Sequence, residues 1–330
     1  MGSLIRGLYQ IVNRCYNAYV NKNTSYLITG GYGLIGSALA NSLTGNVTIL
    51  TRSEKNKDRL IKDAKVIIKD LSEITKTDIE GADVVYHLAS TVDNYNVLTN
   101  PYLDVETNIN GTIRLLELCK NLAKKPKIVF LSTFFVYGNE YDRTQIPINE
   151  DSKTDPLAIY PATKLCSESI IKLYSRLYDI PYLICRLTNV YSENEDYNNK
   201  KKGGLNYMIM QAVKGKTLSV YEGGNFYRDY IHVSDIVSAL LFLENKNIRN
   251  DTFLIGYGEP VLFKDIVSCI HQLTAKKSKT QEVEPPFFHN VVGINNFVAD
   301  ISKIKKLGWE PKINYKEGLK KVVERYKNLQ

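Results

Sequence analysis

The sequence predicts an α/β protein built on a doubly wound parallel sheet, with a smaller, interleaved C-terminal lobe. Two observations predict it. Short β-prone apolar runs alternate with helical stretches over the first 186 residues, and a glycine-rich turn joins the first run to the first helix. The 330 residues, 44% of them hydrophobic, suffice for one large domain or two interleaved ones.

The elements follow in order. The first strand is the run 26–28, and later runs that predict strands lie at 47–51, 66–69, 84–88, 128–132 and 182–186. Helical patterns separate them, notably at 107–123 and 160–178. Beyond residue 186 the alternation loosens, the polar stretch 192–204 predicts a loop, and a helix at 233–244 returns to the main sheet.

Residues 1–24 precede the first strand and carry apolar side chains at helical spacing, with charges only at Arg6, Arg14 and Lys22. We expect a basic amphipathic helix. Packing on this protein or a sister subunit is favoured over a peripheral membrane contact by residues 1–22. No apolar run approaches the ~20 residues that span a bilayer, and no secretory signal is expected.

Five scattered cysteines without a C-x-x-C spacing predict reduced thiols, a cytoplasmic location and no zinc site, and the four dispersed histidines also argue against a metal centre. The net charge of +8 comes largely from lysine-rich patches. A solvated surface is the favoured reading, over attraction of a phosphate-bearing ligand or an anionic surface. No motif indicates nucleic-acid binding.

The glycine-rich turn is Thr29-Gly-Gly-Tyr-Gly-Leu-Ile-Gly36. Its glycines at 30, 33 and 36 lie between a strand and a helix, where a dinucleotide pyrophosphate can rest on bare backbone N–H groups and a helix N-terminus. Such a string is weak evidence by itself, because glycine-rich turns also occur for packing. Tyr160 and Lys164, one helical turn apart, strengthen it.

Tyr160 and Lys164 place a phenol and an ammonium on one helix face. A phenol with a pKa of about 10 is a poor base at neutral pH, and a nearby ammonium lowers that pKa. The phenol can then exchange a proton with a sugar oxygen while hydride moves at carbon. Thr133, which follows the apolar strand 128–131, lies at a strand's C-terminal end and can bond the reacting oxygen.

Together these motifs resemble the extended short-chain dehydrogenase/reductase family, the nucleotide-sugar epimerase, dehydratase and reductase group. The resemblance covers about residues 25–328. It implies a Rossmann-type sheet, a homodimer paired through the helices at 107–123 and 160–178, and an NAD(P)-dependent enzyme acting on a nucleotide-diphosphate sugar, by analogy in surface-polysaccharide synthesis. It also implies a division into an extension at 1–24, a dinucleotide-binding domain at 25–186 with 233–255, and a nucleotide-sugar-binding lobe at 187–232 and 256–330.

The resemblance assigns site residues in three groups. The catalytic group is Thr133, Tyr160 and Lys164. The cofactor-binding group adds to Tyr160 and Lys164 the residues Gly30, Tyr32, Gly33, Leu34, Ile35, Gly36, Arg52, Ser53, Asp70, Leu71, Leu88, Ala89 and Asn108. The substrate-binding group is Thr133, Phe134, Asn189 and Arg228, whose guanidinium fork suits the nucleotide phosphates.

Departures from the family pattern narrow the reaction. The 4,6-dehydratases carry Asp-Glu after the catalytic threonine, where this chain has Phe134-Phe135, so water elimination is not expected. The glutamate of decarboxylating members and the cysteine of fucose-synthase-type enzymes are also missing, and the two phenylalanines predict an apolar wall suited to a deoxy-sugar methyl group. After Tyr191 the usual Gly-Pro is replaced by Ser192-Glu193.

The second strand ends in Leu50-Thr51-Arg52-Ser53, without the acidic residue that accepts from the ribose 2′-OH in NAD-preferring members. This favours NADP(H), with NAD(H) as the alternative. The sequence therefore predicts first an NADPH-dependent reductase of a 4-keto, 6-deoxy nucleotide sugar. The alternative is an NAD-dependent nucleotide-sugar 4-epimerase, and the third reading is an inactive binding protein on the same fold.

Overall fold

The computed structural model describes residues 23–60, 63–91, 100–198, 204–275, 278–294 and 296–329. The amphipathic helix predicted within residues 1–22 lies outside these ranges. Among the described helices, none combines the length and the apolar character that crossing a bilayer requires. The four described cysteines are free thiols, and the described side chains form no group of three or more potential metal ligands.

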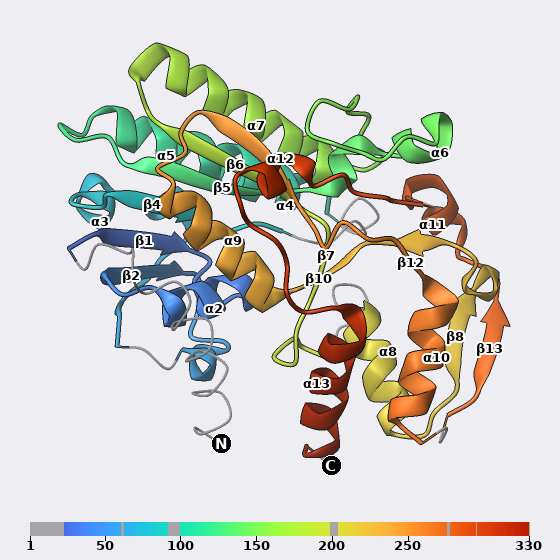
Figure 1. The fold of residues 1–330 in the computed structure, drawn as a ribbon. Coiled ribbons are helices and arrows are strands. Elements are labelled where there is room, and N and C mark those ends of the chain that lie inside the picture. Colours follow the sequence, from blue (N-terminus) through green and yellow to red (C-terminus); the bar gives the residue numbers. More distant parts are fainter. Residues whose placement is uncertain are drawn as a thin grey trace.

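A seven-stranded sheet forms the centre of the molecule (Figure 1). Its strand order is β11-β6-β5-β4-β1-β2-β3, and every neighbouring pair is parallel. The strands are β1 (Ser25–Thr29), β2 (Asn46–Thr51), β3 (Lys65–Ile68), β4 (Val84–His87), β5 (Lys127–Thr133), β6 (Tyr182–Leu187) and β11 (Asp251–Ile255). The order reverses at β1, as in a Rossmann-type doubly wound sheet, so the predicted fold class is confirmed.

Helices cover both faces of this sheet, as the alternation of strands and helices predicts. In Figure 1, α5 and α7 lie above the sheet, and α2 and α9 lie below it. The longer helices are α2 (Leu34–Ser42), α5 (Gly111–Lys120), α7 (Ile159–Tyr178), α8 (Gly204–Val213), α9 (Val233–Asn245), α10 (Phe263–Leu273) and α13 (Tyr315–Lys327). The shorter ones are α3 (Lys76–Ile79), α4 (Tyr102–Asp104), α6 (Glu140–Thr144), α11 (Phe287–Val292) and α12 (Ser302–Lys306).

Three short two-stranded sheets and five turns of other helix types complete the described structure. The pairs are β7 (Asn189–Tyr191) with β10 (Tyr230–His232), β9 (Tyr227–Arg228) with β12 (Val261–Leu262), and β8 (Leu218–Tyr221) with β13 (Thr280–Val283). The 3₁₀ turns are η1 (Lys57–Arg59), η2 (Leu71–Glu73), η5 (Phe134–Tyr137) and η6 (Glu222–Gly224), and η4 (Val105–Asn110) is a π-helix.

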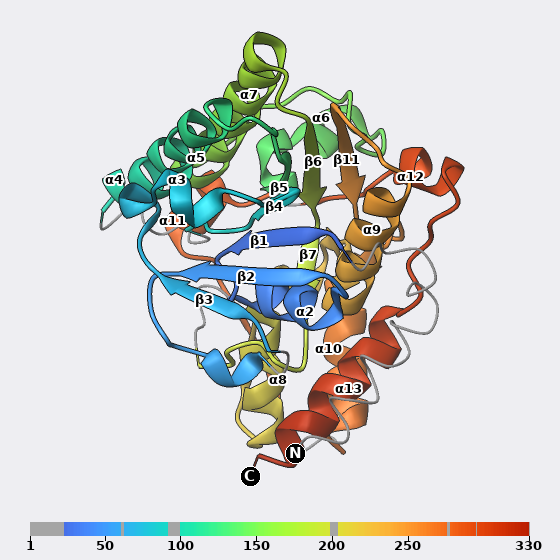
Figure 2. The same cartoon turned by 90° about the vertical axis from the view of Figure 1, so that its left-hand side faces the viewer.

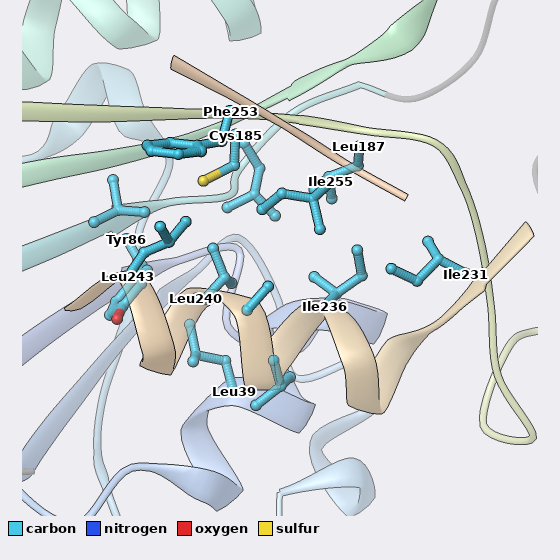
Figure 3. Close-up of a cluster of buried hydrophobic side chains, with 14 of the residues drawn as sticks. Leu39, Tyr86, Cys185, Leu187, Ile231, Ile236, Leu240, Leu243, Phe253 and Ile255 are labelled. Carbon is cyan, nitrogen blue, oxygen red and sulfur yellow. The ribbon is translucent and has the colours of Figure 1, made fainter. Parts of the chain in front are cut away.

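Each face of the sheet has its own apolar core. Figure 3 shows the core between the sheet and the helices α9 and α2, which includes Leu39, Leu240, Cys185 and Phe253. Leu39 is fully buried, which removes enough apolar surface from water to contribute about 2 kcal/mol. A second core lies between the sheet and α3, α5 and α7, and a third lies among α8, α10 and α13.

The C-terminal part of the chain forms a smaller group of elements beside the carboxyl ends of the sheet strands. Figure 2 shows α10 and α13 running side by side there, below the edge at which β11 lies. The chain returns to the main sheet through α9, which packs against α2, and then adds β11 to β6. The exact division into domains stays a prediction.

Candidate active site

The glycine turn approaches the neighbouring strand very closely. Gly30 has a φ of +72°, and a Cβ there would lie 3.0 Å from the Cα and N of Ala89, after β4. At Gly36, a Cβ would lie 2.5 Å from the carbonyl oxygen of Gly30, so the helix rests directly on the turn. These contacts bring Gly30, Gly36 and Ala89 together, as the dinucleotide motif predicts.

The N-terminus of α2 is free to receive an anion. Gly33 is its N-cap residue; within the part of the chain that the structure describes, no side-chain cap is found there, and the first turn holds no acidic residue. The partial positive charge of the helix end and its N–H groups therefore favour a phosphate, and the residues fit a dinucleotide. Leu34 and Ile35 form the first turn, and Tyr32 is buried in the main core.

The adenosine end of the predicted cofactor site is exposed. Arg52 and Ser53 follow β2 on the surface, and the Ser53 hydroxyl accepts only from its own loop, from the N–H of Lys55 at 3.4 Å. Asp70 caps η2 through Ser72, and this hydrogen bond with the charge of Arg52 lowers the pKa of its carboxyl. Leu71 packs into the core beneath α5. Their contacts with adenine stay predictions.

Thr29 and His87 fix the carboxyl end of β4. The Thr29 hydroxyl accepts from the backbone N–H groups of Leu88 and Ala89, at 3.1 and 3.0 Å, and bonds the Nδ1 of His87 at 2.9 Å. The other imidazole nitrogen bonds Thr112 at 2.9 Å. Burial and the charge of Lys164 lower the pKa of His87 to about 3, so the imidazole is neutral and structural.

The three predicted catalytic residues meet where β5 ends and α7 begins. Thr133 ends β5, and its side chain acts on the phenol of Tyr160, whose pKa it lowers. Positions 160, 164, 167 and 171 repeat at helical spacing and are buried, so α7 turns Tyr160 and Lys164 toward the sheet. The Nζ of Lys164 lies over the ring of Phe130, 3.9 Å from its centroid.

Burial acts in opposite directions on this pair. It raises the pKa of Tyr160, which the hydrogen bond from Thr133 partly offsets, and it lowers the pKa of Lys164 to about 7. Glu168, one turn further along α7, favours the charged lysine. The phenol of the chain by itself is therefore protonated near neutral pH. The predicted lowering of the phenol's pKa by Lys164 stays a prediction.

Asn108 joins this cluster as the centre of a hydrogen-bond network. Its side-chain nitrogen donates to Thr163 at 3.0 Å and to Thr91 at 3.2 Å. Its side-chain oxygen accepts from the hydroxyl of Ser90 at 2.8 Å. Sequence reasoning missed Ser90, Thr91 and Thr163; the only signal was their polarity at the end of the fourth strand and inside the Tyr160–Lys164 turn.

A buried ion pair supports α7 from the sheet. Glu168 and Arg186 are 1% and 5% exposed, and two guanidinium nitrogens bond the carboxylate at 2.7 to 3.2 Å. Arg186 also donates to the hydroxyl of Tyr137 at 2.8 Å. Because this pair is buried and fully bonded, it fixes the helix that carries Tyr160 against β6.

The predicted substrate residues fall into two places. Asn189 and Arg228 flank Asp229, and the Asn189 side chain donates to the Asp229 carbonyl at 3.0 Å. The guanidinium of Arg228 lies over Phe226, 4.5 Å from the ring centroid, and burial lowers its pKa. Phe134 is 3% exposed and packs on Phe297, with ring centroids 4.6 Å apart. Contact of these residues with a substrate stays a prediction.

Glu193, which stands where the family has proline, is held by a buried histidine. The Nε2 of His232 lies 2.9 Å from its carboxylate, and this contact lowers the pKa of Glu193 to about 2 against the opposing effect of burial. The Nδ1 of His232 accepts from the N–H of Ser234 at the start of α9. The altered loop is therefore tied to α9.

Known proteins are similar to this chain in sequence and in fold. The model of the NAD dependent epimerase/dehydratase family matches residues 26–256. A putative UDP-glucose 4-epimerase of Methanocaldococcus jannaschii is 32% identical over 92% of this chain and 98% of its own. The structure resembles a UDP-glucose 4-epimerase of Thermotoga maritima solved with UDP-glucose, with a TM-score of 0.84, 25% identity, and coverage of 93% of this chain and 99% of that one.

A third relative is the UDP-glucuronic acid 4-epimerase of Bacillus cereus, solved with UDP-glucuronic acid and NAD. Its TM-score is 0.81 and its identity 26%, over 93% of this chain and all of that one. The family resemblance read from the sequence is confirmed. The chain belongs to the NAD dependent epimerase/dehydratase family, the nucleotide-sugar branch of the extended short-chain dehydrogenase/reductase enzymes.

Proposed function

We propose that the protein is an NAD-dependent 4-epimerase of UDP-linked hexoses. The observation that carries the proposal is the meeting of Thr133, Tyr160 and Lys164 where β5 ends and α7 begins, in a chain that matches a putative UDP-glucose 4-epimerase almost end to end. The proposal reverses the order of our sequence prediction, in which a 4-keto reductase came first. The similarity to solved 4-epimerases supports this reversal.

The chain's own residues supply binding and proton transfer. The Gly30–Gly36 turn and the free N-terminus of α2 would hold the pyrophosphate, and Arg228 and Asn189 would hold the nucleotide side of the substrate. The chemistry that NAD would supply there is reversible hydride transfer at C4 of the sugar. Tyr160 takes the proton of the 4-hydroxyl and later gives one back.

Thr133 and Lys164 assist this proton transfer. The Thr133 hydroxyl would orient the sugar oxygen together with the phenol of Tyr160. Lys164 would hold the cofactor ribose beside Tyr160 from the same face of α7. Asn108 and Glu168 keep this face in place through the contacts described above.

The test is to purify the protein, release any bound nucleotide by denaturation and identify it by mass spectrometry, and then supply UDP-glucose without added cofactor. We expect near-stoichiometric NAD and formation of UDP-galactose. If no UDP-hexose or UDP-hexuronic acid is epimerised by NAD-loaded protein, the proposal fails.

A second candidate is the NADPH-dependent 4-keto reductase. The observation that favours it is the exposed Arg52 beside Ser53, with no acidic residue at the end of β2 to accept from a ribose 2′-OH. The aromatic residues in place of the dehydratase acids agree with it. An exchangeable NADP(H), consumed stoichiometrically with a 4-keto-6-deoxy nucleotide sugar, would establish this reading instead.

We further propose a homodimer formed through α5 and α7, in the cytoplasm, where the free thiols stay reduced. Leu173, Leu177 and Tyr178 on α7 are 43%, 60% and 38% exposed, an apolar strip that a second copy would cover. Light scattering of wild type against Leu177→Glu tests the dimer. A monomeric wild type would overturn it.

A further inference from the structure

A buried carboxylate lies at the start of the segment that carries Asn108. Asp104 ends α4 and is 1% exposed, and the hydroxyl of Thr91 donates to it. The same Thr91 oxygen accepts from Asn108 at 3.2 Å, and the Thr91 N–H donates to the Asn108 side chain at 3.3 Å. Thr91 is thus held between two residues of one helical segment, Asp104 and Asn108.

In this network the side-chain amide of Asn108 donates on both sides. The amide of Asn108 donates to the Thr163 hydroxyl at 3.0 Å, which in turn donates to the Tyr160 carbonyl at 2.8 Å. On the other side, the amide donates to the Thr91 hydroxyl, which in turn donates a hydrogen bond to Asp104. A carboxylate only accepts, so Asp104 fixes the orientation of the Thr91 hydroxyl and of the Asn108 amide.

The backbone supports the same arrangement. The π-helix η4 begins directly after Asp104 and ends two residues after Asn108. The Asn108 carbonyl accepts from the side chains of Thr112 at 2.5 Å and Ser167 at 2.8 Å. Irregular helical turns of this kind are common at functional sites. The turn presents Asp104 and Asn108 together to Thr91.

Asp104 also acts electrostatically on the phenol. Its negative charge raises the pKa of Tyr160, in addition to burial and against the hydrogen bond from Thr133. Among the described residues, Glu168 on α7 acts on Lys164, and the imidazole of His87 on β4 is neutral. Asp104 is the described carboxylate that acts on Tyr160 from the side of η4.

We propose that Asp104 is a positioning residue of the reaction: through Thr91 and Asn108 it orients the first turn of α7. The inference rests on the proposed tyrosine chemistry, which the epimerase and the reductase share. Neither the sequence motifs nor the predicted site residues gave Asp104 a role.

The test compares Asp104→Asn, Asp104→Ala and Thr91→Val in the full-length protein. Ionisation of Tyr160 is followed by ultraviolet difference titration against Tyr160→Phe, and kcat and KM are measured across pH. Asp104→Asn keeps an acceptor for Thr91 but loses the charge. We expect Asp104→Asn to lower the apparent pKa of Tyr160 by about one unit and to move the rising limb of the pH profile of kcat by the same amount.

Asp104→Ala and Thr91→Val break the chain of bonds. We expect kcat to fall about tenfold in both, with KM within about twofold, and only the alanine variant to shift the titration. Glu106→Gln is the matched control, because Glu106 is exposed on η4 and its substitution removes the same charge. Circular dichroism checks the fold of each variant.

An unshifted Tyr160 titration in folded Asp104→Asn, or an equal shift in Glu106→Gln, would overturn the electrostatic role. Wild-type kcat in Thr91→Val would overturn the positioning role. The titration needs no turnover, so it tests the electrostatic role even if the proposed epimerase activity is absent. Wild-type kcat in both Thr91→Val and Asp104→Ala, in an enzyme that epimerises its substrate, leaves the proposed function standing and removes Asp104 from it.

Discussion

The two ends of the cofactor site differ in how firmly they are built. At the catalytic end, Thr133, Tyr160 and Lys164 are at most 8% exposed and are held by side chains from other elements. At the adenosine end, Arg52 and Ser53 are exposed, and the described hydrogen bonds of Ser53 stay within its own loop. Chemistry at the buried end is constrained by packing, whereas cofactor choice at the exposed end depends on contacts that only the ligand provides.

The largest effect should come from the buried end. Tyr160→Phe removes one hydroxyl, which carries the proposed proton, so we expect turnover to fall about a thousandfold with unchanged thermal stability. Tyr178→Phe, partly exposed on the same helix, should keep wild-type turnover. Initial rates of nucleotide-sugar conversion measure both. A Tyr160→Phe enzyme with more than about a tenth of the activity contradicts the proposed role.

The glycine turn connects the two ends, and Gly36→Ala tests it. The added Cβ would lie 2.5 Å from the Gly30 carbonyl oxygen and 2.9 Å from the Gly31 Cα, so the turn must open. We expect a loss of about 1–3 kcal/mol in the free energy of unfolding, measured in urea, and weaker dinucleotide binding. Gly204→Ala is the control, because no heavy atom lies within 4 Å of its added Cβ.

The buried lysine predicts a pH effect on stability. The pKa of Lys164 falls from 10.5 to about 7 on folding, so the unfolded chain binds more protons between these pH values. The free energy of unfolding should therefore rise with pH across this window, and Lys164→Met should abolish that part of the rise. Urea titrations from neutral to alkaline pH measure it. Parallel curves for wild type and variant would contradict the prediction, and Lys172→Met on α7 serves as control.

The smallest effect should come from the exposed end. Arg52→Ala removes a surface guanidinium, so NAD affinity should change less than about threefold. Calorimetric titration with NAD and with NADP measures this, with Lys55→Ala in the same loop as control. A tenfold loss confined to NADP would show that Arg52 reads a 2′-phosphate and would favour the reductase.

The sequence predicted most of the regular structure because local periodicity determined it. The runs at 47–51, 84–88 and 182–186 appear as β2, β4 and β6, with boundaries within a residue or two, and the pattern at 160–178 appears as α7. The helix predicted at 107–123 was less accurate, because the structure has two elements there, the π-helix η4 and then α5. The apolar spacing over 107–123 predicted one continuous helix and did not show where the wider π-helical turn ends.

The hydrogen-bonded part of the site could not be predicted in the same way. Asn108 and Thr163 are 55 residues apart, and Asn108 and Thr91 are 17 apart, so the network exists only once α7, η4 and the end of β4 meet. Phe134 shows the same limit. Its position after Thr133 predicted a wall for substrate, but its packing on Phe297, from the far end of the chain, was not visible in the sequence.

The π-helix at Val105–Asn110 has an evolutionary consequence. A turn of this kind is what one inserted residue produces in an ordinary α-helix. Deleting one residue there would yield a longer, more regular helix, yet it would rotate the residues before the deletion by about 100° relative to α5. Asp104 and Asn108 could then no longer both reach Thr91. Selection for this enzyme must therefore preserve an irregularity that selection for helix stability alone would remove.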